Sequence, residues 1–82
     1  MGENGVKKHI EDAIEIMVAA GTASNVILGT ATLIVQAWKM AFPGETSMTV
    51  PEIAQSLRAK AARNVSWGKD ELARLDAIIA AQ

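Results

Sequence analysis

Apolar positions are densest between residues 24 and 42, where their spacing predicts one long helix. At about 3.6 residues per turn, a narrow polar stripe runs along this helix. The stripe consists of Asn25, Gly29, Thr32, Gln36 and Lys39. Most of the remaining circumference is apolar, and such a helix must be covered by other elements of the chain, by a partner or by lipid. We therefore expect the protein to be organised around this strongly hydrophobic second helix.

A first amphipathic helix is predicted over 6–20, because apolar residues recur there at every third or fourth position. Gly21 suits the position just after a helix end, where a positive φ is common. Thr22 or Ser24 can then cap the second helix, over 24–42. The short break between the two helices predicts an antiparallel helical hairpin.

The main loop is expected over 43–48, beginning with the helix-breaking pair Pro43-Gly44. Thr49 and Glu52 then have the spacing of a capping box, in which each residue bonds the other's backbone N–H. Together with a proline in the first turn, this box predicts the start of a third helix over 50–64.

A fourth helix is predicted over 67–81, with Ser66 as its cap and Trp67 at its entrance. Asp70 and Glu71 fall in its first turn, where the helix dipole favours negative charge. Every β-branched run in the chain is embedded in helical periodicity, so no strand is predicted. The expected fold class is all-α, a small bundle of four helices.

Composition adds two expectations. The 82 residues suffice for a single helical domain over 1–82, with 1–5 frayed at the N-terminus. Half of the residues are hydrophobic, and the larger apolar side chains are concentrated in the second helix. A domain this small has little surface with which to cover that helix, so we expect self-association as a homodimer or a higher oligomer. The three remaining helices could instead cover the second helix completely.

The charge and the reactive side chains of the sequence give no indication of an enzyme or of a secreted protein. The net charge is −1, and there is no cysteine. Lys7 and Lys8 precede acidic residues instead of the apolar segment of a secretory signal, so a cytoplasmic location is expected. The single histidine, His9, has no serine or cysteine placed to form a catalytic group with it. We therefore expect a protein that is not an enzyme, with no catalytic residues, no cofactor and no metal.

One alternative is a DNA-binding regulator that uses 49–81. The run from Thr49 to Leu57 resembles the first helix of a helix-turn-helix motif, in which a T-x-x-E-I-A-x-x-L pattern is common. The run from Ser66 to Leu72 resembles the opening of a Myb-type helix. The turn glycine expected after Leu57 is Arg58, however, and the basic residues that follow point in different directions around the predicted helix.

A second alternative is a small holin-like membrane protein that uses 16–38. This run contains no charged residue and is long enough to cross a bilayer. Polar residues at 21–25 interrupt it, and Asn25 and Gln36 are costly in lipid unless they are paired.

The interpretation we favour is a small protein–protein interaction module: a regulator, inhibitor, adaptor or assembly factor of bacterial or phage type. Its binding partner would be another protein, itself or both. Large apolar side chains near loops suit a binding hot spot. The candidates for partner contact are Trp38, Met40, Phe42 and Trp67. The candidates for close approach between helices are Gly21, Asn25 and Gly29, because small residues let two backbones come near each other.

Overall fold

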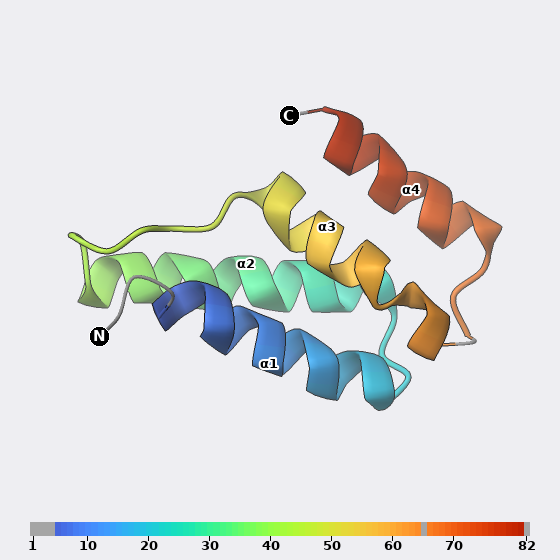
Figure 1. Cartoon of the computed structure of the whole chain (residues 1–82), viewed down its shortest axis with the longest axis horizontal. Coiled ribbons are helices and arrows are strands. Elements are labelled where there is room, and N and C mark those ends of the chain that lie inside the picture. The colour runs from blue at the N-terminus through green and yellow to red at the C-terminus, as the bar shows by residue number, and fades with distance from the viewer. Residues whose placement is uncertain (1–4, 65, 82) are drawn as a thin grey trace.

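The computed structural model describes residues 5–64 and 66–81. Within these residues it contains four α-helices, one 3₁₀ turn and no strand (Figure 1). The elements are α1 (Gly5–Ala19), α2 (Ser24–Ala41), α3 (Val50–Ala59), the 3₁₀ turn η1 (Ala61–Arg63) and α4 (Lys69–Ala80). The predicted all-α fold of four helices is confirmed. Of the segment expected to fray, 1–4 lie outside the described residues, and Gly5 already begins α1.

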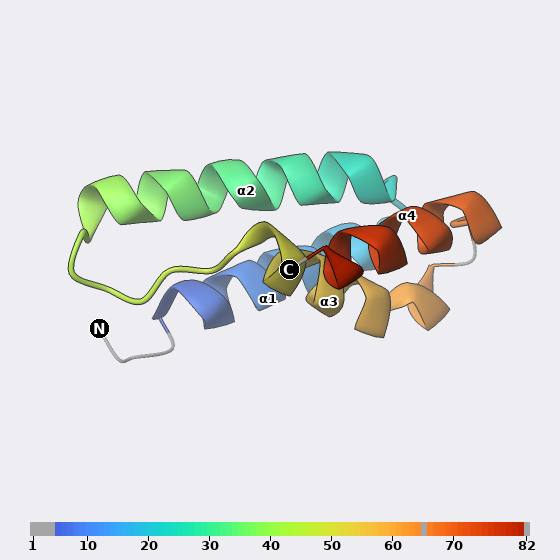
Figure 2. The same ribbon diagram turned by 90° about the horizontal axis from the view of Figure 1, so that it is seen from above.

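The helices are arranged so that α2 has neighbours on one side only. α2 lies along one side of the molecule, with α1 and α3 along the other and α4 packed on α3 (Figure 2). The Cα extents are 38 × 27 × 17 Å. Since a helix with its side chains is about 10 Å across, the smallest dimension accommodates two layers and no third. Among the described residues, no other helix therefore covers the side of α2 that faces away from α1 and α3.

The hydrophobic core lies between these two layers. Its centre is formed by isoleucines of α1, α2 and α3, and leucines of α3 and α4 close it on one side. The fully buried large side chains are Ile10, Ile14, Val18, Ile27, Ile53, Leu57 and Leu75. Full burial of each such side chain stabilises the fold by about 1.5–3 kcal/mol before the conformational entropy it loses is subtracted.

The turn between α1 and α2 forms as the sequence predicts. Gly21 has a φ of 79°, and its N–H donates to the carbonyl of Val18 at 3.0 Å. The N–H of Thr22 donates to the carbonyl of Met17 at 3.1 Å. These two bonds make up a Schellman motif, which satisfies the last carbonyls of α1. Any other residue at position 21 would be strained by the positive φ.

The start of α3 is also confirmed. The N–H of Glu52 donates to Thr49 Oγ1 at 3.3 Å, and the N–H of Thr49 donates to Glu52 Oε1 at 2.8 Å. This is the predicted capping box, with Pro51 in the first turn. The hydrogen bonds from the Thr49 backbone and side chain lower the pKa of the Glu52 carboxyl from its ordinary value.

The boundary between the third and fourth helices differs from the prediction. α3 ends at Ala59 instead of Asn64, and α4 begins at Lys69 instead of position 67. Ser66 does not cap α4: its backbone N–H donates to Asn64 Oδ1 at 3.0 Å, and Gly68 stands at the N-cap without a side-chain bond. The reason lies in Asn64, which follows η1, is only 5% exposed and forms hydrogen bonds with residues of the α1–α2 turn.

Asn64 ties this segment to the end of α1. Its Nδ2 donates to the carbonyls of Val18 at 3.3 Å and of Thr22 at 3.2 Å. The indole N–H of Trp67 also donates to the Thr22 carbonyl, at 2.9 Å. The chain between α3 and α4 is thus anchored to the α1–α2 turn at two points, and a helix that continued to Asn64 would not present its carboxamide in this way.

The N-terminus of α2 is capped by a residue from another helix. The prediction that Thr22 or Ser24 caps it is wrong: Ala23 is the N-cap residue and makes no side-chain bond. Instead, Glu71 Oε2 accepts from the Ser24 N–H at 3.0 Å and from the Ser24 hydroxyl at 2.6 Å. These bonds lower the pKa of the Glu71 carboxyl, and its negative charge lies where the dipole of α2 favours it.

Within the described residues, no helix combines the length and apolar character needed to cross a membrane. The uncharged run 16–38 is divided by the turn at Gly21 into parts of two antiparallel helices. The single spanning segment of the membrane alternative is therefore wrong for this part of the chain.

Candidate interaction surface

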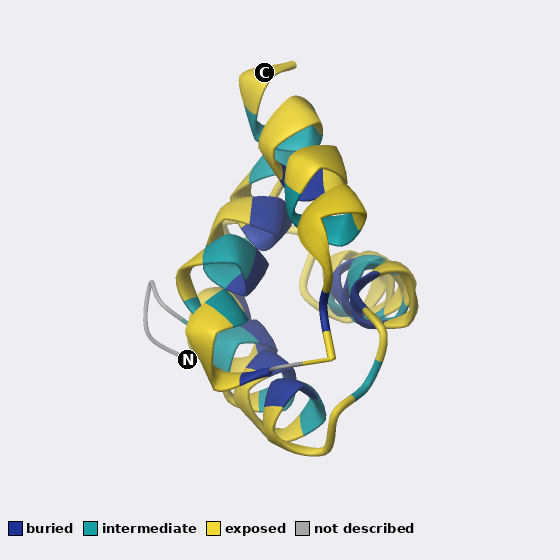
Figure 3. Cartoon of the chain, turned by 90° about the vertical axis from the view of Figure 1, so that its right-hand side faces the viewer, coloured by how far each residue is buried: buried dark blue, intermediate teal, exposed yellow. Residues whose placement is uncertain are grey.

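The outer side of α2 carries a line of exposed apolar side chains. Val26, Leu33 and Met40 are 51%, 67% and 85% exposed. They are spaced seven residues apart, which is about two turns, so they lie along one line on the helix. Viewed end on, α2 is buried toward the other helices and exposed around the opposite side (Figure 3). We call this side the outer face of α2; it comprises Val26, Gly29, Thr30, Leu33, Gln36, Ala37 and Met40.

This surface differs from that of an ordinary surface helix. On such a helix the side away from the core is polar and charged. α2 has one charged residue, Lys39, which lies beside the line of apolar side chains and not on it. Aligned apolar side chains with no charge among them mark interaction sites, whereas single exposed apolar residues are common on any surface.

Sequence reasoning missed Val26 and Leu33 as surface residues, because their periodicity is that of a buried helix. The residues that α2 buries are Ser24, Ile27, Ala31 and Val35, on the opposite side. Both sides of α2 are thus apolar. The signal in the sequence that could have identified them is the seven-residue spacing of Val26, Leu33 and Met40. These three residues lie on a different side of the helix from the residues that α2 buries.

The three candidate residues at the end of α2, Trp38, Met40 and Phe42, do not share one surface in the structure. The Trp38 ring lies between those of His9 and Phe42, with centroids 5.5 and 5.0 Å away. Its indole N–H donates to Glu45 Oε1 at 3.2 Å. Trp38 therefore packs toward α1, with Phe42 against it and 42% exposed. Met40 is separate from these rings and belongs to the outer face.

Trp67 is not available to a partner. It is 7% exposed, packs in the core and uses its indole N–H to bond Thr22. The predicted partner contact at this residue is therefore wrong, and Trp67 serves to hold the chain that precedes α4 on the α1–α2 turn.

The small residues proposed for close helix approach do not approach another helix within the chain. Apart from the adjoining residues and the helix's own backbone, no described heavy atom lies within 4 Å of the position that a Cβ on Gly29 would take, and none lies near that position at Gly21. Gly21 is needed for its positive φ, and Asn25 and Gly29 are exposed on α2. Close approach at Gly29 to a second molecule stays a prediction.

The geometry of the third and fourth helices does not favour DNA binding. A nine-residue segment, 60–68, separates α3 from α4, whereas the helix-turn-helix motif has a turn of about three or four residues. Three basic residues between the start of α3 and the end of η1 are held in ion pairs with other elements. The pairs are Arg58 with Asp76 at 3.0 Å, Lys60 with Glu11 at 3.8 Å, and Arg63 with Glu15.

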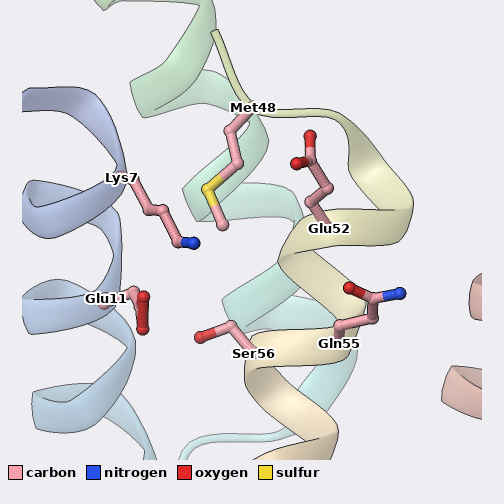
Figure 4. Close-up of a pocket in the computed structure, with 6 residues that line it drawn as sticks. All are labelled: Lys7, Glu11, Met48, Glu52, Gln55 and Ser56. Atoms are coloured by element: carbon pink, nitrogen blue, oxygen red, sulfur yellow. The ribbon is translucent and has the colours of Figure 1, made fainter. Parts of the chain in front are cut away.

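A cavity of about 210 Å³ lies between α1 and α3 (Figure 4). It is lined by Lys7, Glu11, Met48, Glu52, Gln55 and Ser56. The Lys7 ammonium group lies in it, with carboxylates from both helices nearby. The described residues contain no group of three or more histidine, cysteine, aspartate or glutamate side chains that could hold a metal ion. The cavity contains no pairing of a nucleophile with a base, and we regard it as a gap between solvated side chains.

Comparison with known proteins gives no relative: a scan against protein-family models, a search of curated proteins and a search of solved structures each returned no match.

Proposed function

We propose that this chain is a non-enzymatic protein–protein interaction module that binds through the outer face of α2. The observation that carries the proposal is the exposed line of Val26, Leu33 and Met40. Apolar residues at seven-residue spacing match the groove of a second helix, since each side chain can insert between residues of the facing helix. A regulator, inhibitor, adaptor or assembly factor acts through a surface of this kind.

The energetics are consistent with a useful but reversible interaction. Burying a side chain of this size is worth about 1.5–3 kcal/mol relative to leaving it in water. Three such side chains would contribute at most about 4.5–9 kcal/mol, and less because each is already partly shielded, against a cost of at least about 4 kcal/mol for lost translational and rotational freedom. The surface does not include the core, so binding would not require the helices to rearrange.

The proposal is tested by photo-crosslinking in the cells that produce the protein. A benzophenone amino acid is placed at Leu33, and in a matched variant at Ile16. Ile16 is a suitable matched site for the probe because it is also apolar, helical and 70% exposed, but it lies on α1. We expect a protein adduct at Leu33 and little at Ile16. Equal labelling at both positions, or none at Leu33, would refute the proposal.

A further inference from the structure

We infer that the occupant of the outer face is a second copy of this chain, with its α2 antiparallel and a two-fold axis passing through Leu33. This inference rests on the proposed function, because it requires that the outer face binds a helix. It goes further by identifying the partner and the register.

The first argument is that the outer face is complementary to itself when one copy is reversed about Leu33. Val26 then lies level with Met40 of the partner, and Leu33 meets its own equivalent. Between these contacts, the pair Gly29 and Thr30 lies level with the partner's pair Gln36 and Ala37.

Between the Val26–Met40 and Leu33–Leu33 contacts, a long side chain of one copy lies beside a small residue of the other. A Cβ at Gly29 would meet nothing within 4 Å among the described residues, so the space beside it is open to a side chain from outside. In the antiparallel pairing, the long Gln36 side chain of the partner falls beside Gly29, and Ala37 falls beside Thr30. Isologous interfaces require such a patch, in which every residue has its counterpart on the same surface.

The second argument is electrostatic and decides the direction. In a parallel pair, the two Lys39 ammonium groups would lie at the same level, whereas reversal separates them by about 18 Å along the axis. Antiparallel α2 dipoles also attract each other.

The third argument concerns size. An 18-residue helix is about 27 Å long and offers a strip about 10 Å wide. This contact is smaller than the roughly 800 Å² per partner of a standard stable interface. We therefore expect a weak dimer that exchanges with monomer, and the test must cover concentrations from about 1 μM to about 1 mM.

Engineered cysteines test the register directly, because the chain has no cysteine of its own. Val26→Cys and Met40→Cys are both exposed replacements, and each is purified separately. Helices about 8–10 Å apart bring facing Cα atoms within disulfide reach. On oxidation of the mixed proteins, we expect the disulfide between Cys at 26 and Cys at 40 to dominate. Either variant alone should give no more dimer than an Ile16→Cys control, because in the antiparallel pair equivalent residues at these positions lie about 21 Å apart.

The outcomes separate the inference from the proposed function. Light scattering should show a dimer at the highest concentrations for the unmodified chain and for Ile16→Glu, with association weakened at least tenfold in Leu33→Glu. Strong disulfides between identical positions would overturn the antiparallel register. A monomer up to about 1 mM would overturn self-association, and equal loss in both glutamate variants would overturn a second copy as the occupant of the outer face. In those cases an adduct at Leu33 with a different protein would still support the proposed function.

Discussion

Replacing Asn64 by alanine tests whether the anchor between the two halves of the molecule is as important as its geometry suggests. Asn64 Nδ2 donates to the carbonyls of Val18 and Thr22, and Oδ1 accepts from the Ser66 backbone N–H. Alanine cannot make any of these bonds. The substitution therefore removes the direct side-chain link by which the segment after α3 holds the end of α1.

The expected cost follows from what remains after the substitution. The Val18 carbonyl still accepts from the Gly21 N–H, and the Thr22 carbonyl still accepts from the Trp67 indole. Neither is left without a partner, so the larger penalty for an orphaned buried group does not apply. The two hydrogen bonds from Asn64 Nδ2 to Val18 and Thr22, at about 1 kcal/mol each, give a loss of about 2 kcal/mol in the free energy of unfolding. For a domain of this size that is a fall in Tm of about 8–16 °C.

Urea unfolding followed by circular dichroism at the helix band measures this loss. Asn25→Ala is the matched control, because Asn25 is the same residue type but exposed on α2. The control should change the free energy of unfolding by no more than about 0.5 kcal/mol. A loss below about 0.5 kcal/mol for Asn64→Ala, or an equal loss in the control, would refute the assignment of Asn64 as an anchor.

Three further substitutions test the helix ends and the outer face. The pKa of Glu71 is held below its ordinary 4.5 by the bonds from Ser24, so its contribution is present above that pH and is lost as pH falls through the lowered folded value. In Glu71→Gln the free energy of unfolding should therefore fall less steeply in acid titrations than in the parent; an identical slope would contradict the cap. Thr49→Ala breaks the capping box with Glu52 and should cost about 1 kcal/mol by urea unfolding, and no shift in midpoint would argue against the box. Gly29→Ala should raise the free energy of unfolding by about 0.5–1 kcal/mol, because the new Cβ meets no described atom and the helix gains propensity. A lower Tm would mean that this side of α2 is more crowded in the monomer than the structure shows.

The sequence alone determined the helices whose ends are set by nearby residues. α1 ends through the bonds from the Gly21 N–H to Val18 and from the Thr22 N–H to Met17, and Thr49 with Glu52 begins α3 through bonds across three positions. Such signals can be recognised in the sequence because both partners lie within five positions of each other. They sufficed to predict four helices, no strand and the hairpin of α1 with α2.

The tertiary structure decided the ends that depend on distant residues. Asn64 lies 46 positions from Val18, and Glu71 lies 47 positions from Ser24. No local pattern shows that Asn64 leaves the helix to reach a carbonyl of α1, or that the cap of α2 comes from α4. This is why the predicted end of α3 and the predicted caps at Ser66 and Ser24 were wrong.

The outer face of α2, too, could be predicted only in part from the sequence. From the sequence, Met40 could be proposed as a partner contact, and the structure leaves it exposed. The excess of apolar residues on one helix could also be recognised. Which side of α2 becomes core depends on where α1 and α3 pack, and they cover the side of Ile27 while leaving Leu33 in water. Helical periodicity records that both sides are apolar, but burial is a property of the neighbours, and only the assembled fold supplies them.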